Sequence, residues 1–202
     1  MIERKELVKA LCDDFECADK IIQDVKSITK DEVIPAISQL RYSGWHLARW
    51  LNSDISGKPD DEAFSEAKRH SKRAIFEASR YGALFCMLGI QSFRDMYGGE
   101  IMPDVIANYS EKMYRVEESR KFVISVSDKE REVRADACYE HFVAVKDIMQ
   151  ELICCQPELN RLKEQKQNEI GILKKRHRQT IAIPIITTVI MVIITVTMAL
   201  LK

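Results

Sequence analysis

The chain has 202 residues, of which 46% are hydrophobic and 31% charged, and its 31 basic residues balance its 31 acidic ones. This composition is typical of a globular protein, and the seven Gly and five Pro exclude a collagenous or low-complexity chain. The charge is divided unevenly, because residues 158–202 hold eight Lys/Arg and only three Asp/Glu. The remainder, 1–157, is therefore net acidic, which argues against nucleic acid as a partner because nucleic-acid-binding domains are basic.

Apolar residues recur every three or four positions through most of residues 1–156, a period typical of α-helices rather than strands. Breaks in this period and turn-forming residues divide the region into about five helices, which we expect over roughly 7–25, 29–51, 59–97, 103–123 and 127–152. Short connections favour antiparallel neighbours. The predicted fold is all-α: an antiparallel helical bundle, then a helical stalk and a single C-terminal transmembrane helix.

The expected third helix carries small residues at regular intervals along one face. They are Ala67, Ala74, Ala78, Gly82 and Gly89. Small side chains at this spacing let a second helix approach closely. We therefore interpret this face as core packing and not as a ligand site.

The C-terminus holds the strongest single signal in the sequence. From Gln179 to Leu201 there is no formally charged residue. At ~1.5 Å per residue, 22 apolar residues extend roughly 33 Å as a helix, enough to cross a bilayer core of about 30 Å. A buried core helix is the alternative. The sequence thus predicts three segments: a helical head at 1–156, a polar and basic stalk at 157–178, and an anchor at 179–202.

Basic residues lie immediately before this apolar segment, and only Lys202 follows it. They are Lys174, Lys175, Arg176 and Arg178. Positive charge stays on the cytoplasmic side of a membrane, so we expect a single-pass protein with a cytoplasmic N-terminal head. The same four side chains are expected to contact anionic lipid headgroups, which makes the membrane itself a partner. Which membrane is involved stays open.

The sequence contains no recognisable motif for metal, cofactor or nucleotide chemistry. None of its six cysteines forms C-x-x-C, and there is no H-E-x-x-H, P-loop, G-x-S-x-G or G-x-G-x-x-G motif. The expected bundle also lacks the paired Glu-x-x-His motifs of a di-iron site. We therefore expect no cofactor and no metal site, and these absences favour a non-enzymatic protein without deciding the question.

One two-residue pattern keeps an enzymatic alternative open. An Arg and a His separated by four to six residues resemble the pair used by helical ribonucleases of the HEPN type. The pattern occurs at Arg41 and His46, and again at Arg134 and His141. The resemblance implies that the Arg stabilises a phosphate transition state and that the His transfers protons.

The segment 41–50 is the most unusual part of the expected head. Its two Trp and two Arg have the composition of interface hot spots, and we predict a partner-binding set of Arg41, Trp45, Arg49 and Trp50. Trp45 lies off the main apolar stripe of its helix. If Trp45 is exposed, it is a docking residue, and if it is buried, it belongs to the core.

These observations favour a tail-anchored, non-enzymatic protein whose cytoplasmic helical head binds a protein partner as an adaptor or scaffold. The first alternative is a membrane-acting effector, of a toxin, stress or defence type, whose head controls oligomerisation of the span. The second is the HEPN-like ribonuclease. Self-association through the bundle is compatible with each of them, and the sequence does not name the protein partner.

Overall fold

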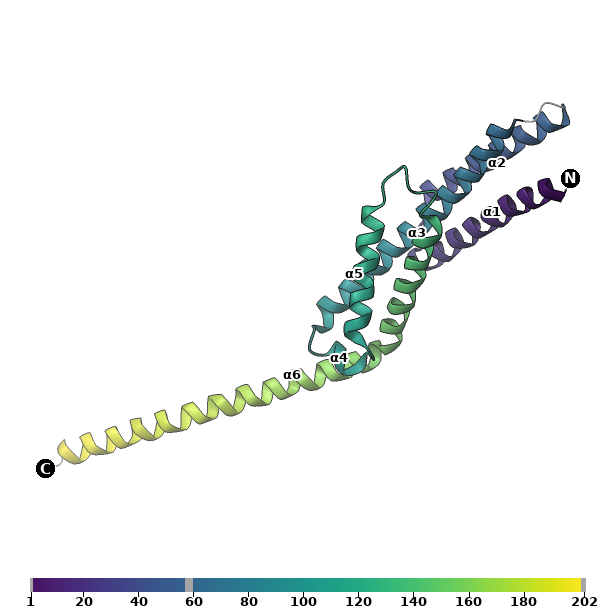
Figure 1. Cartoon of the computed structure of the whole chain (residues 1–202). Coiled ribbons are helices and arrows are strands. Elements are labelled where there is room, and N and C mark those ends of the chain that lie inside the picture. The colour runs from purple at the N-terminus through teal and green to yellow at the C-terminus, as the bar shows by residue number, and fades with distance from the viewer. Residues whose placement is uncertain (1, 57–59, 201–202) are drawn as a thin grey trace. The chain divides into compact units, whose positions relative to one another are not determined.

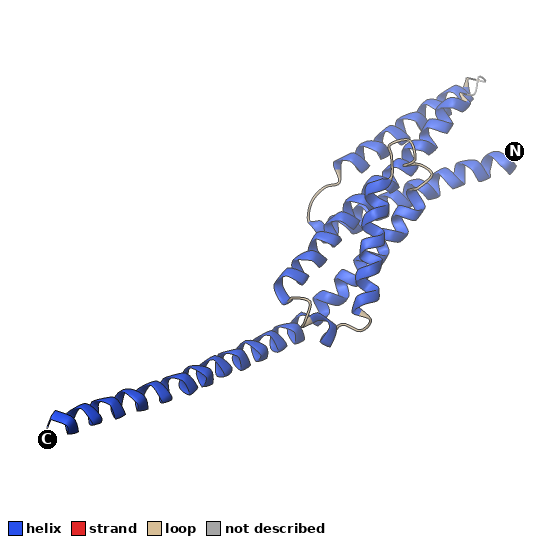
Figure 2. Ribbon diagram, turned by 60° about the vertical axis from the view of Figure 1, so that its left-hand side comes forward, coloured by secondary structure: helices blue, strands red, loops and turns tan. Residues whose placement is uncertain are grey.

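The computed structural model describes the backbone of residues 2–56 and 60–200, and these residues form helices and connecting loops without any β-strand (Figure 2). This part of the chain confirms the all-α prediction. Six helices follow one another along it. They are α1 (Ile2–Thr29), α2 (Ile34–Ile55), α3 (Asp61–Tyr97), α4 (Met102–Val105), α5 (Tyr109–Ser125) and α6 (Ala135–Leu200).

Helix α3 is the central element of the N-terminal part, and it contacts α1, α2 and α5 (Figure 1). Of its small residues, Ala67, Ala74, Ala78 and Gly82 are buried, as their spacing predicts, whereas Gly89 is half-buried. At Gly82 a Cβ atom would lie 2.6 Å from Phe142 Cε2 and 2.7 Å from Val25 Cγ2. The absence of a side chain at Gly82 therefore lets α1, α3 and α6 meet at one point.

Large apolar side chains fill the space around this point. Those that are almost fully buried include Leu11, Ile21, Ile75, Phe76, Ile90, Phe142 and Leu152. They come from α1, α3 and α6, so residues far apart in the sequence share one core. Burial of such side chains from water is the main stabilising contribution to a helical fold.

The two ends of α3 are defined by local chemistry. Asp60 caps the N-terminus, where its Oδ1 accepts a hydrogen bond from the Ala63 N–H at 3.0 Å. At the C-terminus, Gly98 adopts a φ of 73°, which favours glycine, and its N–H donates to the Arg94 carbonyl at 2.9 Å. The helix start expected at Pro59 lies outside the described residues.

The fourth expected helix is interrupted in the structure. The chain forms the short α4, leaves the helical conformation, and begins α5 after Asn108, which has a φ of 55°. A left-handed residue cannot continue an α-helix, and Asn tolerates this conformation better than most residues. The sequence pattern did not reveal this break, because the apolar period continues across it.

The last helix begins later than the sequence indicates. The side chain of Glu130 accepts hydrogen bonds from Ser127 N at 3.2 Å and Ser127 Oγ at 2.7 Å, but the Glu130 N–H donates to the Ser127 carbonyl at 3.0 Å and not to its hydroxyl, so only half of a capping box forms. Residues 128–134 nevertheless form turns, and α6 starts at Ala135. The partial cap is therefore followed by turns and not directly by a regular helix.

The chain divides into two compact units, residues 1–155 and 156–202. The first contains the core described above. In the second, the described backbone is helical from residue 156 to Leu200 and continues through Pro157 and Gly171. Here Arg161 forms an ion pair with Glu158, one turn earlier on the exposed helix surface.

The predicted membrane topology is contradicted. Over the part of the chain that the structure describes, none of the helices combines the length and the apolar character needed to cross a bilayer. The expectation rested on segment 179–201, which is helical as far as Leu200. Its side chains, except that of Thr180, lie outside those described. The predictions of a transmembrane helix and of a single-pass localisation with a cytoplasmic head are therefore wrong.

Candidate functional site

A groove of about 580 Å³ lies along α2 and α3. It is lined by Arg41, Tyr42, Trp45, His46 and His70. Four of these residues come from α2 at positions i, i+1, i+4 and i+5, a spacing that places them on one face of a helix. The fifth comes from α3, so the packing of these two helices forms the groove.

Aromatic rings and guanidinium groups form the outer part of this groove. Trp45 is 58% exposed, and its ring meets the His46 ring edge-on at 4.7 Å between centroids. The Arg41 guanidinium lies 5.3 Å from the centroid of Tyr42, and that of Arg49 lies 6.0 Å from the centroid of Trp45. Of the two readings that the sequence left open for Trp45, the structure shows the exposed one.

Buried hydroxyl groups fix the two helices beneath the groove. The Ser43 hydroxyl donates to the Ala67 carbonyl at 2.8 Å and lies 2.7 Å from Ser71 Oγ. Both serine side chains are buried, so this contact is shielded from water. It sets the register between the α2 and α3 residues that carry the groove.

The other sequence-predicted partner residues lie differently. Trp50 is only 5% exposed and packs against Phe64, with ring centroids 5.1 Å apart. Arg49 forms an ion pair with Asp60 at 2.7 Å and is exposed beside the groove. Of the predicted set, Arg41 and Trp45 line the groove, Arg49 borders it, and Trp50 belongs to the core.

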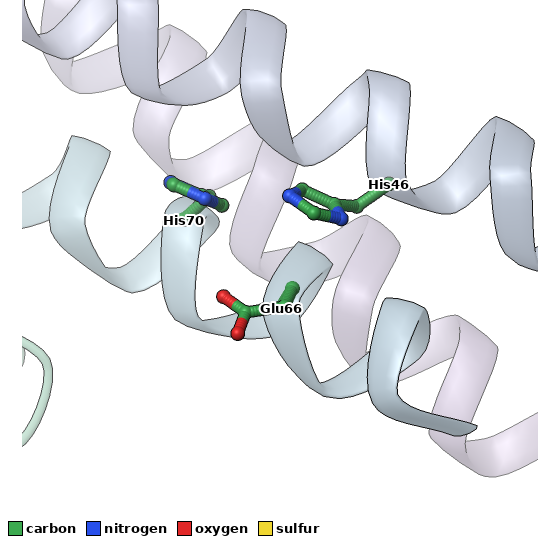
Figure 3. A group of neighbouring side chains, drawn as sticks. All are labelled: His46, Glu66 and His70. Carbon is green, nitrogen blue, oxygen red and sulfur yellow. The ribbon is translucent and has the colours of Figure 1, made fainter. Parts of the chain in front are cut away.

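A second feature occupies the inner side of the same helices. His46, Glu66 and His70 each offer a ligand atom, and these atoms all lie within 4.8 Å of one another. Figure 3 shows the two imidazole rings facing each other, with the Glu66 carboxylate below them. The rings are nearly parallel, at 16°, with centroids 5.2 Å apart. Two nitrogen donors and one carboxylate are a common ligand set for transition metals.

The hydrogen bonds around the two histidines determine which nitrogens are available. His70 Nδ1 lies 2.6 Å from Gln39 Oε1, and a carbonyl oxygen only accepts, so Nδ1 carries the proton. His70 Nε2 is therefore left with a free lone pair. His46 Nδ1 is buried and has no hydrogen-bond partner among the described residues. Leaving a buried polar atom unpaired costs about 1–3 kcal/mol.

The charges around this cluster are mixed. Burial is the main reason that the pKa of His70 lies below its ordinary value, and His46 and the nearby Arg73 and Arg69 lower it further. The His70 ring is therefore neutral near pH 7, as metal coordination requires. The Glu66 carboxylate forms an ion pair with Arg69 one turn later on α3. Arg69 thus competes with any cation for this carboxylate.

Sequence reasoning missed this cluster because it searched for ligands at motif spacing. Glu66 and His70 are four residues apart, which places them on one helix face, and that pair was a usable signal. His46 is 20 residues before Glu66 on another helix, and no local pattern connects the two.

The second Arg–His pair lies elsewhere, where α5 meets the start of α6. The His141 ring centroid is 4.3 Å from that of Phe122, and the Arg134 guanidinium is 5.9 Å from the same ring. His141 Nδ1 is also hydrogen-bonded to the Ser119 hydroxyl at 2.9 Å. Packing against Phe122 and Ser119 accounts for His141 without a catalytic role.

The predicted headgroup-binding residues lie on the second unit. Lys174, Lys175 and Arg176 are exposed on α6, and the side chain of Arg178 lies outside those described. Their contact with lipid headgroups depended on the adjacent span and stays a prediction.

A larger groove, of about 620 Å³, lies between α5 and α6 within the first unit. Its lining is mainly charged, and the ion pair between Lys112 and Glu151 at 2.6 Å lies in it. These opposite charges are already paired with each other. Unlike the groove around Trp45, this groove has no exposed tryptophan in its lining.

No known protein family, no curated protein and no solved structure matches this chain. Its function must therefore be argued from the site itself.

Proposed function

We propose that residues 1–155 form a non-enzymatic protein-binding module, and that its contact surface is the groove around Trp45. The observation that carries this proposal is the 58% exposure of Trp45 between two arginines. Large aromatic side chains are costly to leave in water, and Trp and Arg are the residue types that most often dominate binding energy at interfaces.

The partner is a protein segment that presents a carboxylate beside an apolar side chain. Arg41 is exposed, and among the described residues its contact is with the Tyr42 ring and not with an acid. A carboxylate of the partner can therefore form the ion pair that Arg41 lacks, while an apolar side chain covers Trp45. This local positive charge differs from the acidic balance of residues 1–157 as a whole.

A displayed library of random peptides, selected on the full-length chain, tests this proposal. We expect the selected peptides to combine Asp or Glu with an aromatic or large aliphatic residue. A synthetic copy of one such peptide should bind at least about tenfold more weakly to Trp45→Ala and to Arg41→Gln, which is typical for loss of a hot-spot residue.

The matched control is Tyr114→Ala, because Tyr114 on α5 is 67% exposed and lies outside the groove. This variant should bind the peptide as the natural chain does. Selection of peptides without acidic residues, or equal binding to Trp45→Ala, would contradict the proposal.

The HEPN-like ribonuclease is kept as a second candidate for one reason. Arg41 and His46, which match its pattern, line the same groove. If this candidate is correct, the full-length chain cleaves a single-stranded RNA, and His46→Asn and Arg41→Gln each abolish the cleavage while Trp45→Ala retains it. An RNA left intact by the natural chain would exclude the candidate.

A further inference from the structure

We propose that His46, Glu66 and His70 form a binding site for a divalent transition-metal ion, with Zn²⁺ as the cation that this donor set suits best. This site shares His46 and His70 with the groove around Trp45 but takes a different class of ligand. The metal site does not depend on the protein-binding proposal, because metal binding is measured without any protein partner.

The geometry requires only a small adjustment. Bonds of about 2.0–2.2 Å in a tetrahedral zinc site place the ligand atoms roughly 3.4 Å from one another. The three ligand atoms here lie within 4.8 Å of one another. The widest pair must therefore close by no more than ~1.4 Å, which rotations of the half-buried side chains can supply.

The surroundings of the histidines support a metal ligand role more than an ordinary core role. Gln39 Oε1 accepts a hydrogen bond from the Nδ1–H of His70, which orients the ring and leaves the Nε2 lone pair for a metal ion. His46 has a buried nitrogen without a partner. A metal ion would also bridge two imidazoles that face each other without a hydrogen bond between them (Figure 3).

Three protein ligands leave at least one coordination position for water or another ligand. The groove around Trp45 reaches both histidines, so this position is accessible from solvent. The buried contact between Ser43 and Ser71 keeps α2 and α3 in the register that brings His46 to Glu66 and His70. Zinc therefore links two helices that the core already holds together.

Isothermal titration of the metal-stripped, full-length chain with Zn²⁺ tests the site. We expect one zinc ion per chain. The corresponding heat should disappear in His46→Asn, Glu66→Gln and His70→Asn, and Gln39→Ala should weaken binding by about tenfold because it removes the orienting hydrogen bond. The control is His141→Asn, which alters a half-buried histidine away from the site and should leave zinc binding unchanged.

Arg69→Gln tests the same site by a gain of affinity. Arg69 pairs with Glu66 and is 45% exposed, so its removal frees the carboxylate without altering the core. We expect this variant to bind Zn²⁺ more tightly than the natural chain. Circular dichroism shows whether each ligand variant is folded. If one is not, the Arg69→Gln variant still tests the site.

Exposed cysteines are the main competing source of a zinc signal. Cys12 and Cys17 are both exposed on α1. The proposal is overturned if zinc binding persists in folded His46→Asn and His70→Asn, or if it is lost only when Cys12 and Cys17 are changed to Ser. It is equally overturned if the natural chain binds no Zn²⁺ and Arg69→Gln binds none either.

Discussion

The hydroxyl group of Ser43 lies 2.7 Å from that of Ser71, in the buried interface between α2 and α3. Ser43 precedes His46 by less than one helical turn, and Ser71 directly follows His70. This contact therefore connects the core to both the groove around Trp45 and the cluster of metal-ligand side chains.

Removing this hydrogen bond should destabilise the protein. Ser43→Ala leaves the buried Ser71 hydroxyl without this partner, so we expect a loss of about 1–2 kcal/mol in the free energy of unfolding. Ser71→Ala should cost a similar amount, and the double variant should cost less than the sum of the two. Urea denaturation of the three variants measures these values.

Ser65→Ala is the control for this cycle, because Ser65 is exposed on α3. It should change the stability by less than about 0.5 kcal/mol. Strict additivity of Ser43→Ala and Ser71→Ala would show that the two hydroxyls do not interact.

Two glycine substitutions should have opposite effects. In Gly82→Ala the new Cβ would lie 2.6 Å from Phe142 Cε2, so helices must separate, and we expect a loss of about 1–3 kcal/mol. In Gly44→Ala the new Cβ meets nothing within 4 Å, so the better helix propensity of Ala should add about 0.5–1 kcal/mol. Thermal unfolding compares both with the natural chain, and a stable Gly82→Ala would show that the core is looser than described.

Stability should depend on pH through His141. Burial is the main cause that lowers the pKa of His141 below its ordinary value of 6.5 in this structure. The unfolded chain therefore binds a proton at higher pH than the folded one does. The contribution of His141 to the free energy of unfolding is complete when the pH is above the pKa of this residue in the unfolded chain. It is lost as the pH falls from there towards the lower pKa that His141 has in the folded chain.

Urea titrations between pH 8 and pH 5, with a chelator present, measure this dependence. His141→Gln should show a shallower decrease in stability with falling pH than the natural chain, whatever its absolute stability. An unchanged slope would mean that His141 titrates alike in both states. His70, whose pKa burial also lowers, supplies a further part of the slope.

The cysteines should react in two distinct groups. Burial raises the pKa of Cys86 to about 11 and that of Cys138 to about 12, whereas Cys12 and Cys154 are exposed. Thiolates are the reactive form, so iodoacetamide at pH 8 should label the exposed pair in the folded protein and the buried pair only after unfolding. Mass spectrometry identifies the labelled sites, and rapid labelling of Cys138 in the folded chain would contradict the packing of α6 against α3.

The sequence by itself determined that the described chain is helical, because the apolar period of a helix is a local property of the residues that form it. The same reasoning singled out the segment 41–50, in which Arg41 and Trp45 line the groove, and it placed Ala67, Ala74, Ala78 and Gly82 of α3 in the core. The prediction of a transmembrane helix was wrong, because no described helix is long and apolar enough to cross a bilayer.

Only the tertiary structure decided which side chains meet. Trp45 and Trp50 both lie in the segment 41–50, yet one is exposed and the other is covered by Phe64 from α3. His46 reaches Glu66 and His70 only because α2 packs against α3 in one register. That register depends on contacts between residues far apart in the chain, which a periodic pattern along one helix does not encode.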